Sequence, residues 1–149
     1  MSALQYAVST SKLSLKSLDA IQWVFLLVLR LWLAKVFFLS GLTKIQSWET
    51  TLMLFEYEYA VPLLSPYFAA VLATIAELII PIALVLGLFT RLTIIALFLL
   101  NLVAAISYPD ISPAGVKDHL IWALACIVLF FYGPGLAALD YFIRRKWFE

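Results

Sequence analysis

The chain has 149 residues, of which 65% are hydrophobic and only 13% are charged, and its formal net charge is +1. Its mean hydropathy is +1.05, whereas soluble domains average about 45–50% apolar residues. This composition excludes an ordinary soluble protein, and the near-neutral charge gives no electrostatic basis for a nucleic-acid partner. We therefore expect an integral membrane protein whose main partner is the lipid bilayer.

One cysteine, Cys126, and one histidine, His119, limit the redox chemistry that the chain can carry alone. A dithiol relay needs paired cysteines, and a membrane haem held by two histidines needs a second histidine. The sequence also lacks a metal-ligand cluster and a glycine-rich phosphate loop. We expect no metal and no intrinsic cofactor, so redox work would need a diffusible cofactor or a partner subunit. Cys126 is expected to be a buried packing residue rather than a reactive thiol.

Residues 1–19 are polar and serine-rich, and the apolar run after them is too long for a secretory signal. They are predicted to be a cytoplasmic tail, either a short amphipathic helix on the leaflet or a partly ordered segment. Residues 20–43 are predicted to form the first span, because about 20 apolar residues cross the hydrocarbon core. Arg30 and Lys35 lie inside it, where a buried cation needs a partner. Lys35 points away from Arg30, and it can reach the interface or line another face.

The connector over residues 44–66 is too polar to cross a membrane. Ser47 can cap a helix over residues 48–59. The large apolar residues of this helix share one face: Trp48, Leu52, Phe55 and Tyr59. Its three glutamates lie elsewhere: Glu49, Glu56 and Glu58. An amphipathic helix in the membrane interface is therefore predicted.

Three further spans are predicted, each bounded by loops with proline, glycine or charged residues: residues 67–88, 92–108 and 119–138. A tight turn over Gly87–Arg91 joins the first two of these, and a basic tail at 140–149 follows the last. Pro81 can kink its span and free a backbone carbonyl. Because the loops are short, we predict a single all-α membrane domain over residues 1–149. Its fold class is an antiparallel four-transmembrane-helix bundle, with the interfacial amphipathic helix between the first two spans.

Lysine and arginine residues outside the spans are unevenly divided between the two sides of this topology. One side holds six: Lys12, Lys16, Arg91, Arg144, Arg145 and Lys146. The other side holds two: Lys44 and Lys117. Cytoplasmic loops carry the excess of these residues, so both termini are predicted to be cytoplasmic.

Three polar residues from three predicted spans lie at a similar depth: Arg30, Glu77 and Asn101. Counted from the cytoplasmic span ends, their depths are about 15, 16 and 14 Å at about 1.5 Å per residue. Arg30 and Glu77 have opposite charges and inward-facing stripes, so they are predicted to form a buried pair with Asn101 within hydrogen-bonding reach. The arrangement can be a structural ion pair that fixes helix register. It can also be a polar pocket for a quinone headgroup, or a proton path.

His119 is predicted at the outer end of the fourth span, beside Asp118. One interpretation is an interfacial histidine without special chemistry. The other is a gate or a proton entry, because histidine changes charge near physiological pH.

The order of these features resembles the DoxX family of small bacterial four-span membrane proteins. The matching pieces follow in chain order within residues 25–135: Arg30, Ser40–Ile45, Ala76–Leu78, Leu86–Arg91 and Asn101. The resemblance implies a multi-pass protein of the bacterial inner membrane, near respiratory or sulfur redox chemistry. The family includes a subunit associated with thiosulfate:quinone oxidoreduction, and other members are linked to redox-stress assemblies or to operons for metal-binding peptides.

We therefore expect a DoxX-type subunit that assists quinone-linked electron transfer with a redox partner subunit. Arg30, Glu77 and Asn101 would form its polar site, with Lys44 and His119 near the periplasmic mouth and a bound quinone as ligand. No residue is assigned a catalytic role, so the chain is at most an oxidoreductase subunit without its own metal or dithiol centre. The alternatives are a non-catalytic scaffold or assembly factor for metal or redox-stress homeostasis, and a small-solute transporter. Whether the chain forms a homo-oligomer is also left open.

Overall fold

The structure is a computed structural model that describes residues 3–133, 135 and 138–148, and the side chains of 18–133, 135, 138–143, 145 and 146. Its helices are α1 (Ala3–Gln46), α2 (Trp48–Tyr57), α3 (Pro66–Leu86), α4 (Thr90–Ile106), α5 (Pro113–Tyr132) and α6 (Leu139–Phe148). No strand occurs among the described residues. Three helices are long and apolar enough to cross a membrane, namely α1 over Leu18–Gln46, α3 and α5, and α4 is a shorter apolar helix.

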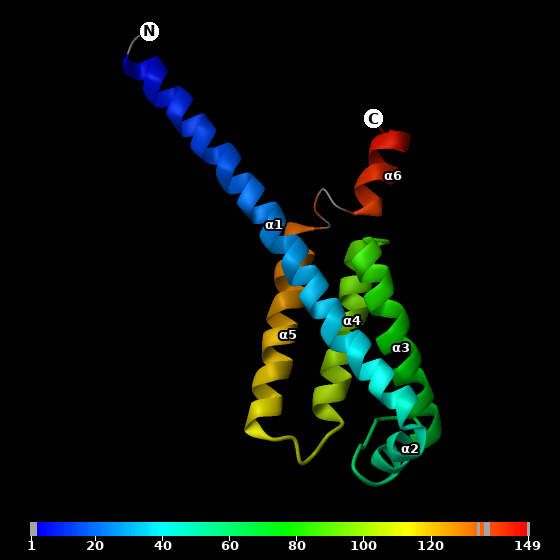
Figure 1. Cartoon of the computed structure of the whole chain (residues 1–149). Coiled ribbons are helices and arrows are strands. Elements are labelled where there is room, and N and C mark those ends of the chain that lie inside the picture. The colour runs from blue at the N-terminus through cyan, green and yellow to red at the C-terminus, as the bar shows by residue number, and fades with distance from the viewer. Residues whose placement is uncertain (1–2, 134, 136–137, 149) are drawn as a thin grey trace.

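The helices α1, α3, α4 and α5 pack side by side, and α1 runs obliquely across the others (Figure 1). α1 packs mainly along α3, and α4 packs mainly along α5. The N-terminal end of α1, the α3–α4 turn and α6 lie at one end of the molecule, which we call the turn end. α2 and the α4–α5 loop lie at the opposite end, which we call the α2 end.

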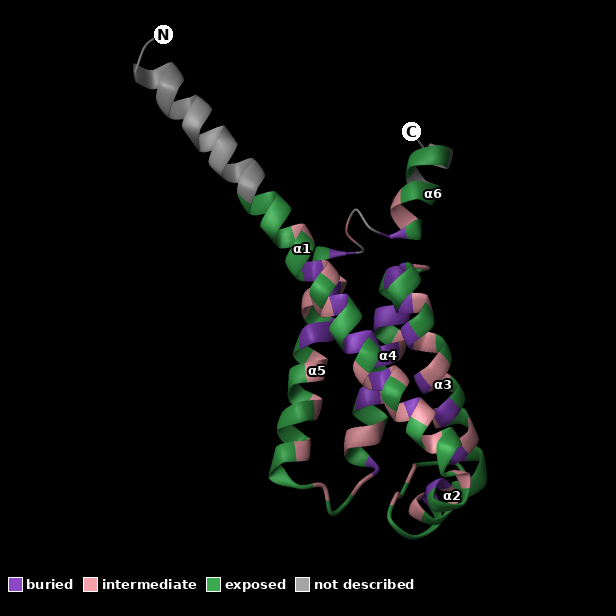
Figure 2. Cartoon of the chain, viewed as in Figure 1, coloured by how far each residue is buried: buried purple, intermediate pink, exposed green. Residues whose placement is uncertain are grey.

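Buried residues gather where the helices face one another, while the outer faces are exposed (Figure 2). The main core joins residues from four helices: Leu26, Leu33, Ala34, Phe37, Leu84, Ile94, Leu97, Ala125, Cys126 and Leu129. Cys126 is 1% exposed in this core, which confirms its prediction as a packing residue. Lys35 is exposed and points away from the core.

Large apolar side chains form outward stripes at helical spacing. On α3 the stripe comprises Phe68, Leu72, Ile75, Ile79 and Ile82. On α4 it comprises Leu92, Ile95, Leu99, Leu102 and Ile106. Soluble monomers rarely expose apolar surfaces of this extent, because water solvates them poorly. The stripes therefore support contact with the hydrocarbon of a lipid bilayer.

α1 is one continuous helix and has no break between the predicted tail and the predicted first span. α1 begins at Ala3 and reaches Gln46, so the described part of residues 1–19 is helical and continues directly into the predicted first span. The candidate span in α1 is 29 residues long, which exceeds the roughly 20 residues that an upright span needs. A long hydrophobic helix is accommodated by tilting, and α1 lies obliquely in the structure (Figure 1). The side chains of Lys12, Lys16 and Arg144 lie outside the described ones.

α2 confirms the predicted helix in the connector. Ser47 lies at its N-cap position, but its side chain makes no capping hydrogen bond. The predicted apolar face packs against α3, where Phe55 joins Ala69 and Ala70 in a second buried cluster.

α3 and α4 lie close to the bounds predicted for the second and third spans. Pro66 occupies the first turn of α3, where a missing N–H is harmless. α3 continues through Pro81, which cannot donate a helix hydrogen bond to the carbonyl of Glu77. α3 ends at Gly87, whose φ of 66° is left-handed. The N–H groups of Gly87 and Leu88 bond to the carbonyls of Leu84 and Ala83, which forms a Schellman cap.

α5 begins at Pro113, six residues before the predicted fourth span, and ends at Tyr132. The Ser112 hydroxyl accepts a hydrogen bond from the Gly115 N–H at 3.1 Å, and Pro113 follows as the first helical residue. A serine N-cap followed by proline is a common start of a helix. The sequence prediction had placed both residues in the loop before the fourth span. Gly133, with a φ of 81°, ends the helix.

Candidate functional site

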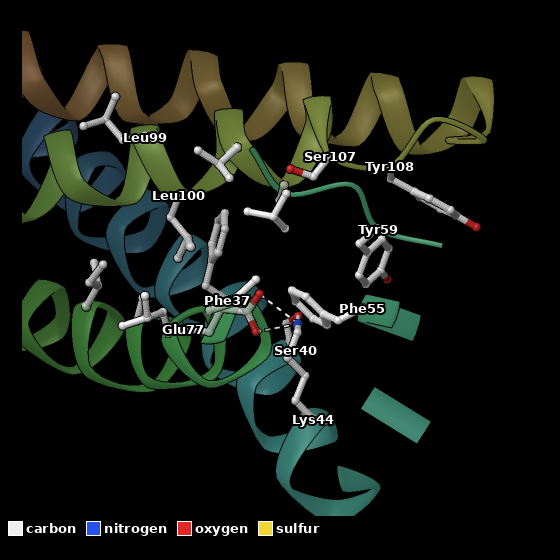
Figure 3. A pocket seen from close by; sticks show the side chains of 18 of the residues that line it. Phe37, Ser40, Lys44, Phe55, Tyr59, Glu77, Leu99, Leu100, Ser107 and Tyr108 are labelled. Atoms are coloured by element: carbon white, nitrogen blue, oxygen red, sulfur yellow. Dashed lines mark hydrogen bonds and ion pairs between the residues drawn. The ribbon is translucent and has the colours of Figure 1, made fainter. Parts of the chain in front are cut away.

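A cavity of about 540 Å³ lies between α1, α3 and α4 at the α2 end (Figure 3). Most of its lining side chains are alanine, valine, leucine, isoleucine or aromatic residues. The polar residues on its wall are few: Ser40, Lys44, Tyr59, Glu77, Ser107, Tyr108 and His119. Apolar walls with a few placed polar groups are typical of small-molecule sites, whose volumes are about 300–1,000 Å³.

An ion pair between α1 and α3 lies on this wall. The Lys44 Nζ donates to the Glu77 Oε2 at 2.6 Å and to the Oε1 at 2.9 Å. It also donates to the Ser40 Oγ, one turn earlier on α1, at 3.0 Å. Helical side chains point toward the N-terminus of their helix, so the ammonium of Lys44 reaches back toward the bundle interior. Figure 3 shows the three side chains converging at the cavity.

Two local features bring α1 and α2 to this position. Gly41 is buried, and a Cβ there would lie 3.0 Å from Leu78 and 3.1 Å from the Glu77 Cβ. The absence of a side chain thus lets α1 approach α3 beside the ion pair. The Thr51 hydroxyl donates to the Lys44 carbonyl at 3.1 Å, which ties α2 to the end of α1.

A second polar pair links α4 to α5. The Asn101 Nδ2 donates to the main-chain carbonyl of His119 at 2.9 Å. The Asn101 Oδ1 lies 2.7 Å from the His119 Nδ1. Asn101 is 3% exposed, and His119 lines the cavity. Both hydrogen-bonding groups of Asn101 are therefore directed to one histidine.

One hydroxyl on the cavity wall has no protein partner. Ser107 is 3% exposed, and within the part of the chain that the structure describes its Oγ makes no hydrogen bond. Its main chain is fixed, because its N–H bonds to the Val103 carbonyl and its carbonyl accepts from the Ala60 N–H at 2.7 Å. Buried hydroxyls are almost always hydrogen-bonded, so the enclosed Ser107 Oγ is an exception among the described residues.

An aromatic cluster lies at the α2 end of the cavity. The ring of Tyr59 packs edge-on against Phe55 at 4.9 Å and against Tyr108 at 5.2 Å. Burial is the main cause that raises the pKa of Tyr59, and the neighbouring Glu58 carboxylate is the main cause that raises the pKa of Tyr108. Both phenols therefore stay neutral.

The cavity reaches the outer surface between α3 and α4. Leu72 and Leu99 line it and also belong to the outward apolar stripes, being 52% and 53% exposed. The tight turn joins α3 and α4 at the turn end, and the two helices separate toward the α2 end (Figure 1). A ligand in the cavity can therefore extend sideways into the surrounding apolar phase.

The predicted pairing of Arg30 with Glu77 is wrong, because Glu77 pairs with Lys44. The depth comparison counted α1 from residue 20 and treated the helices as upright, whereas α1 begins at Ala3 and lies obliquely. The predicted position of Asn101 beside this pair is wrong for the same reason, since Asn101 bonds to His119. The inward stripe of α1 was predicted correctly, and Lys44 belongs to it together with Arg30.

Arg30 lies at the turn end instead. It is 3% exposed, and its Nη1 is 3.2 Å from where a Cβ on Gly87 would lie. Asp140 attracts it electrostatically. The Asp140 carboxylate accepts hydrogen bonds from the Phe89 N–H at 2.8 Å, the Thr90 N–H at 2.6 Å and the Thr90 hydroxyl at 2.7 Å. The start of α4 is thus capped by a residue fifty positions away.

Three of the five predicted site residues line one cavity: Lys44, Glu77 and His119. Asn101 hydrogen-bonds to His119, and Arg30 lies at the turn end. Ser40, Ser107 and Asp140 were not among the predicted site residues. Ser40 could have been found from its position one turn before Lys44, whereas nothing local identifies the other two.

The model of one protein family, described as DoxX, matches residues 25–110. The match covers more than half of the chain and all of the lining residues except His119 and Trp122. No curated protein and no solved structure matches the chain.

Proposed function

The chain belongs to the DoxX family, and on that premise we propose that it is an inner-membrane protein that binds a quinone headgroup in this cavity. It assists quinone-linked electron transfer and works with a partner oxidoreductase that exchanges the electrons. Reduction of a quinone to a quinol takes two electrons and two protons, and the chain's own contribution is to bind the ring and to guide protons.

The observation that carries this proposal is a mainly apolar cavity whose wall holds the Lys44–Glu77 ion pair and His119. A quinone headgroup has an apolar ring and two polar oxygens, and this wall offers apolar contacts with a few polar partners. The volume of about 540 Å³ suits a ring of this size class. The opening beside Leu72 and Leu99 gives an isoprenoid tail a path into the bilayer.

The ion pair supplies the charged part of the site. The ammonium of Lys44 favours the ionised form of the Glu77 carboxylate and offsets part of the cost of burying it. Glu77 can then accept a proton from a ligand hydroxyl while Lys44 keeps the local charge balanced. Glu77 lies in the middle of α3, and Lys44 reaches it from the last turn of α1. Acidic residues inside membranes are typical of proton paths.

The proposed topology has four spans and both termini in the cytoplasm. The N-terminal end of α1, the α3–α4 turn and α6 share the turn end, and exposed Arg91, Arg145 and Lys146 lie there. Cytoplasmic segments are enriched in such residues. The cavity then opens toward the periplasmic half of the membrane, with α2 lying in the interface.

The test is quinone binding to protein purified from its native membrane and to two matched variants. Ala76 lines the cavity and Ala83 lies two turns further along α3, away from it. We expect quinone to copurify with the wild type and with Ala83→Phe, and to be lost with Ala76→Phe. Absence of quinone from the wild type, together with no binding of added quinone, contradicts the proposal.

A non-catalytic scaffold is the second candidate. Three exposed carboxylates project from the connector, Glu49, Glu56 and Glu58, and two exposed cations project from α6, Arg145 and Lys146. Opposite ends of the molecule thus offer charged surfaces to other proteins. Mass spectrometry of natively purified complexes distinguishes the two candidates, because a scaffold retains its partners when Ala76→Phe fills the cavity.

A further inference from the structure

The hydrogen bonds around Asn101 fix the orientation of its amide. The main-chain carbonyl of His119 has no proton, so it can only accept, and the group that faces it at 2.9 Å must be the Asn101 NH₂. The Asn101 Oδ1 then faces the His119 Nδ1 at 2.7 Å. An amide oxygen can only accept, so the Nδ1 of His119 carries the proton.

The neutral imidazole therefore keeps its lone pair on Nε2. A neutral histidine has one N–H and one acceptor nitrogen. The ring is held from the side by Trp122, whose centroid is 4.9 Å away, and Trp122 contacts Phe37 at 5.5 Å. Because His119 is on the cavity wall, Nε2 is the one polar atom of this ring left to a ligand.

The other charged group on the wall also offers acceptors. The ammonium of Lys44 is engaged by the Ser40 hydroxyl and by both oxygens of Glu77. A lysine has three N–H donors, so little donor capacity is left for a ligand. The carboxylate of Glu77 has lone pairs beyond those that Lys44 uses. The polar groups that α3 and α5 leave available to a ligand are thus acceptors.

We infer that Asn101 is a positioning residue that fixes the tautomer of His119, and that the acceptors of His119 and Glu77 select a ligand with hydroxyl donors. In terms of the proposed function, on which this second part rests, the cavity binds the reduced quinol in preference to the oxidised quinone. Ser107, whose hydroxyl both donates and accepts, tolerates either form.

The tautomer is measured without any ligand. His119 is the only histidine of the chain, so isotope-labelled histidine gives one imidazole spin system without assignment. In buffer of about pH 8, where an ordinary imidazole is neutral, we expect nitrogen and carbon shifts of the Nδ1–H form. Asn101→Leu removes the acceptor and should yield a mixture of tautomers, whereas Leu102→Ala, on the exposed face of α4, should leave the shifts unchanged. An Nε2–H form in the wild type overturns the assignment.

The ligand preference is measured anaerobically with three probes that share a ten-carbon chain: a benzoquinol, its quinone and its dimethyl ether. We expect the quinol to bind about tenfold or more tightly than the ether, which has no hydroxyl donor, and to shift the Nε2 signal. His119→Ala should abolish this preference, and His119→Gln, which keeps an acceptor oxygen, should restore part of it.

The outcomes separate the two ideas. Equal binding of the three probes overturns the preference and leaves the proposed function standing. Binding of none of them to the wild type overturns the proposed function and the preference together. The tautomer measurement still decides the role of Asn101 in that case.

Discussion

The two ends of the molecule each place a cation of α1 near a carboxylate, but the carboxylates are used differently. At the turn end, Asp140 bonds to two main-chain N–H groups and a hydroxyl at the start of α4. At the α2 end, Glu77 bonds to a lysine side chain on the wall of a cavity. The first carboxylate closes a turn, and the second borders a space that a ligand can enter.

This difference separates a structural group from a functional one without reference to sequence similarity. Main-chain donors are fixed by the fold, so Asp140 has one arrangement and stabilises it. Side-chain donors such as Lys44 can rotate, so the Glu77 pair can exchange partners with a ligand. The orphaned Ser107 hydroxyl lies at the same end as the exchangeable pair. We therefore expect stability to dominate at the turn end and binding to dominate at the α2 end.

The largest effect on stability is nevertheless expected from breaking the Glu77 pair on one side only. Glu77→Leu leaves the half-buried Lys44 ammonium without its carboxylate. Loss of one partner of a fully buried pair costs about 3–5 kcal/mol, and we expect a loss toward the lower end of that range. The free energy of unfolding in mixed detergent micelles measures it.

The matched control is the double variant Lys44→Met with Glu77→Leu. An apolar replacement of both partners is often neutral, so it should recover most of the lost stability while ligand binding stays lost. Additive losses in this cycle would show that the two residues are not coupled.

The next largest effect is expected at Gly87. In Gly87→Ala the left-handed backbone alone costs about 1–2 kcal/mol. The new Cβ would also lie 2.5 Å from the Ala138 Cβ. Thermal unfolding in detergent should drop, and quinone affinity of the folded fraction should not change. Ala138→Gly in the same chain should recover only a small part of the loss, because the Ala138 Cα would still lie 2.7 Å from the new Cβ. An unchanged Tm in Gly87→Ala would refute the close contact.

The turn at Gly87 also shows what sequence can and cannot predict. The Gly87–Arg91 turn, the apolar runs of α3 and α4, the helix in the connector and the inward stripe of α1 followed from local patterns. The partners of Arg30 and Glu77 did not, because they depend on the tilt of α1, which no local pattern encodes. The capping of α4 by Asp140 is a contact over fifty residues, and the sequence contains no sign of it. The cavity itself results from the separation of α3 and α4 and was likewise beyond prediction.

Removing the distant cap tests the structural role of the turn end directly. Asp140→Ala leaves the N–H groups of Phe89 and Thr90 without their acceptor, and loss of a helix cap costs about 0.5–2 kcal/mol. Glu49→Gln, an exposed carboxylate at the other end, is the control and should be neutral. We expect a lower Tm for Asp140→Ala only, and equal changes in both variants would argue against a specific cap.

The smallest effects are expected from two serines at helix starts. The Ser112 side chain accepts from the Gly115 N–H, whereas the Ser47 side chain makes no such bond. Ser112→Ala should lower stability by about 1 kcal/mol, and Ser47→Ala should change it little. The free energies of unfolding of the two variants, measured under the same conditions, give the difference. A reversed order would show that the cap geometry at one of these helices is wrong.

The unbroken length of α1 restricts how the protein can move. Arg30 and Lys44 are fourteen residues apart on this one helix, about 21 Å at about 1.5 Å per residue. Each is engaged by a different neighbour, Arg30 at the α3–α4 turn and Lys44 at the middle of α3. A helix held at two points along its axis cannot slide or rotate without breaking both attachments. The motion left to α1 is a pivot. Entry of a ligand beside Lys44 would therefore change the tilt of α1 and move the part of α1 that packs at the turn end.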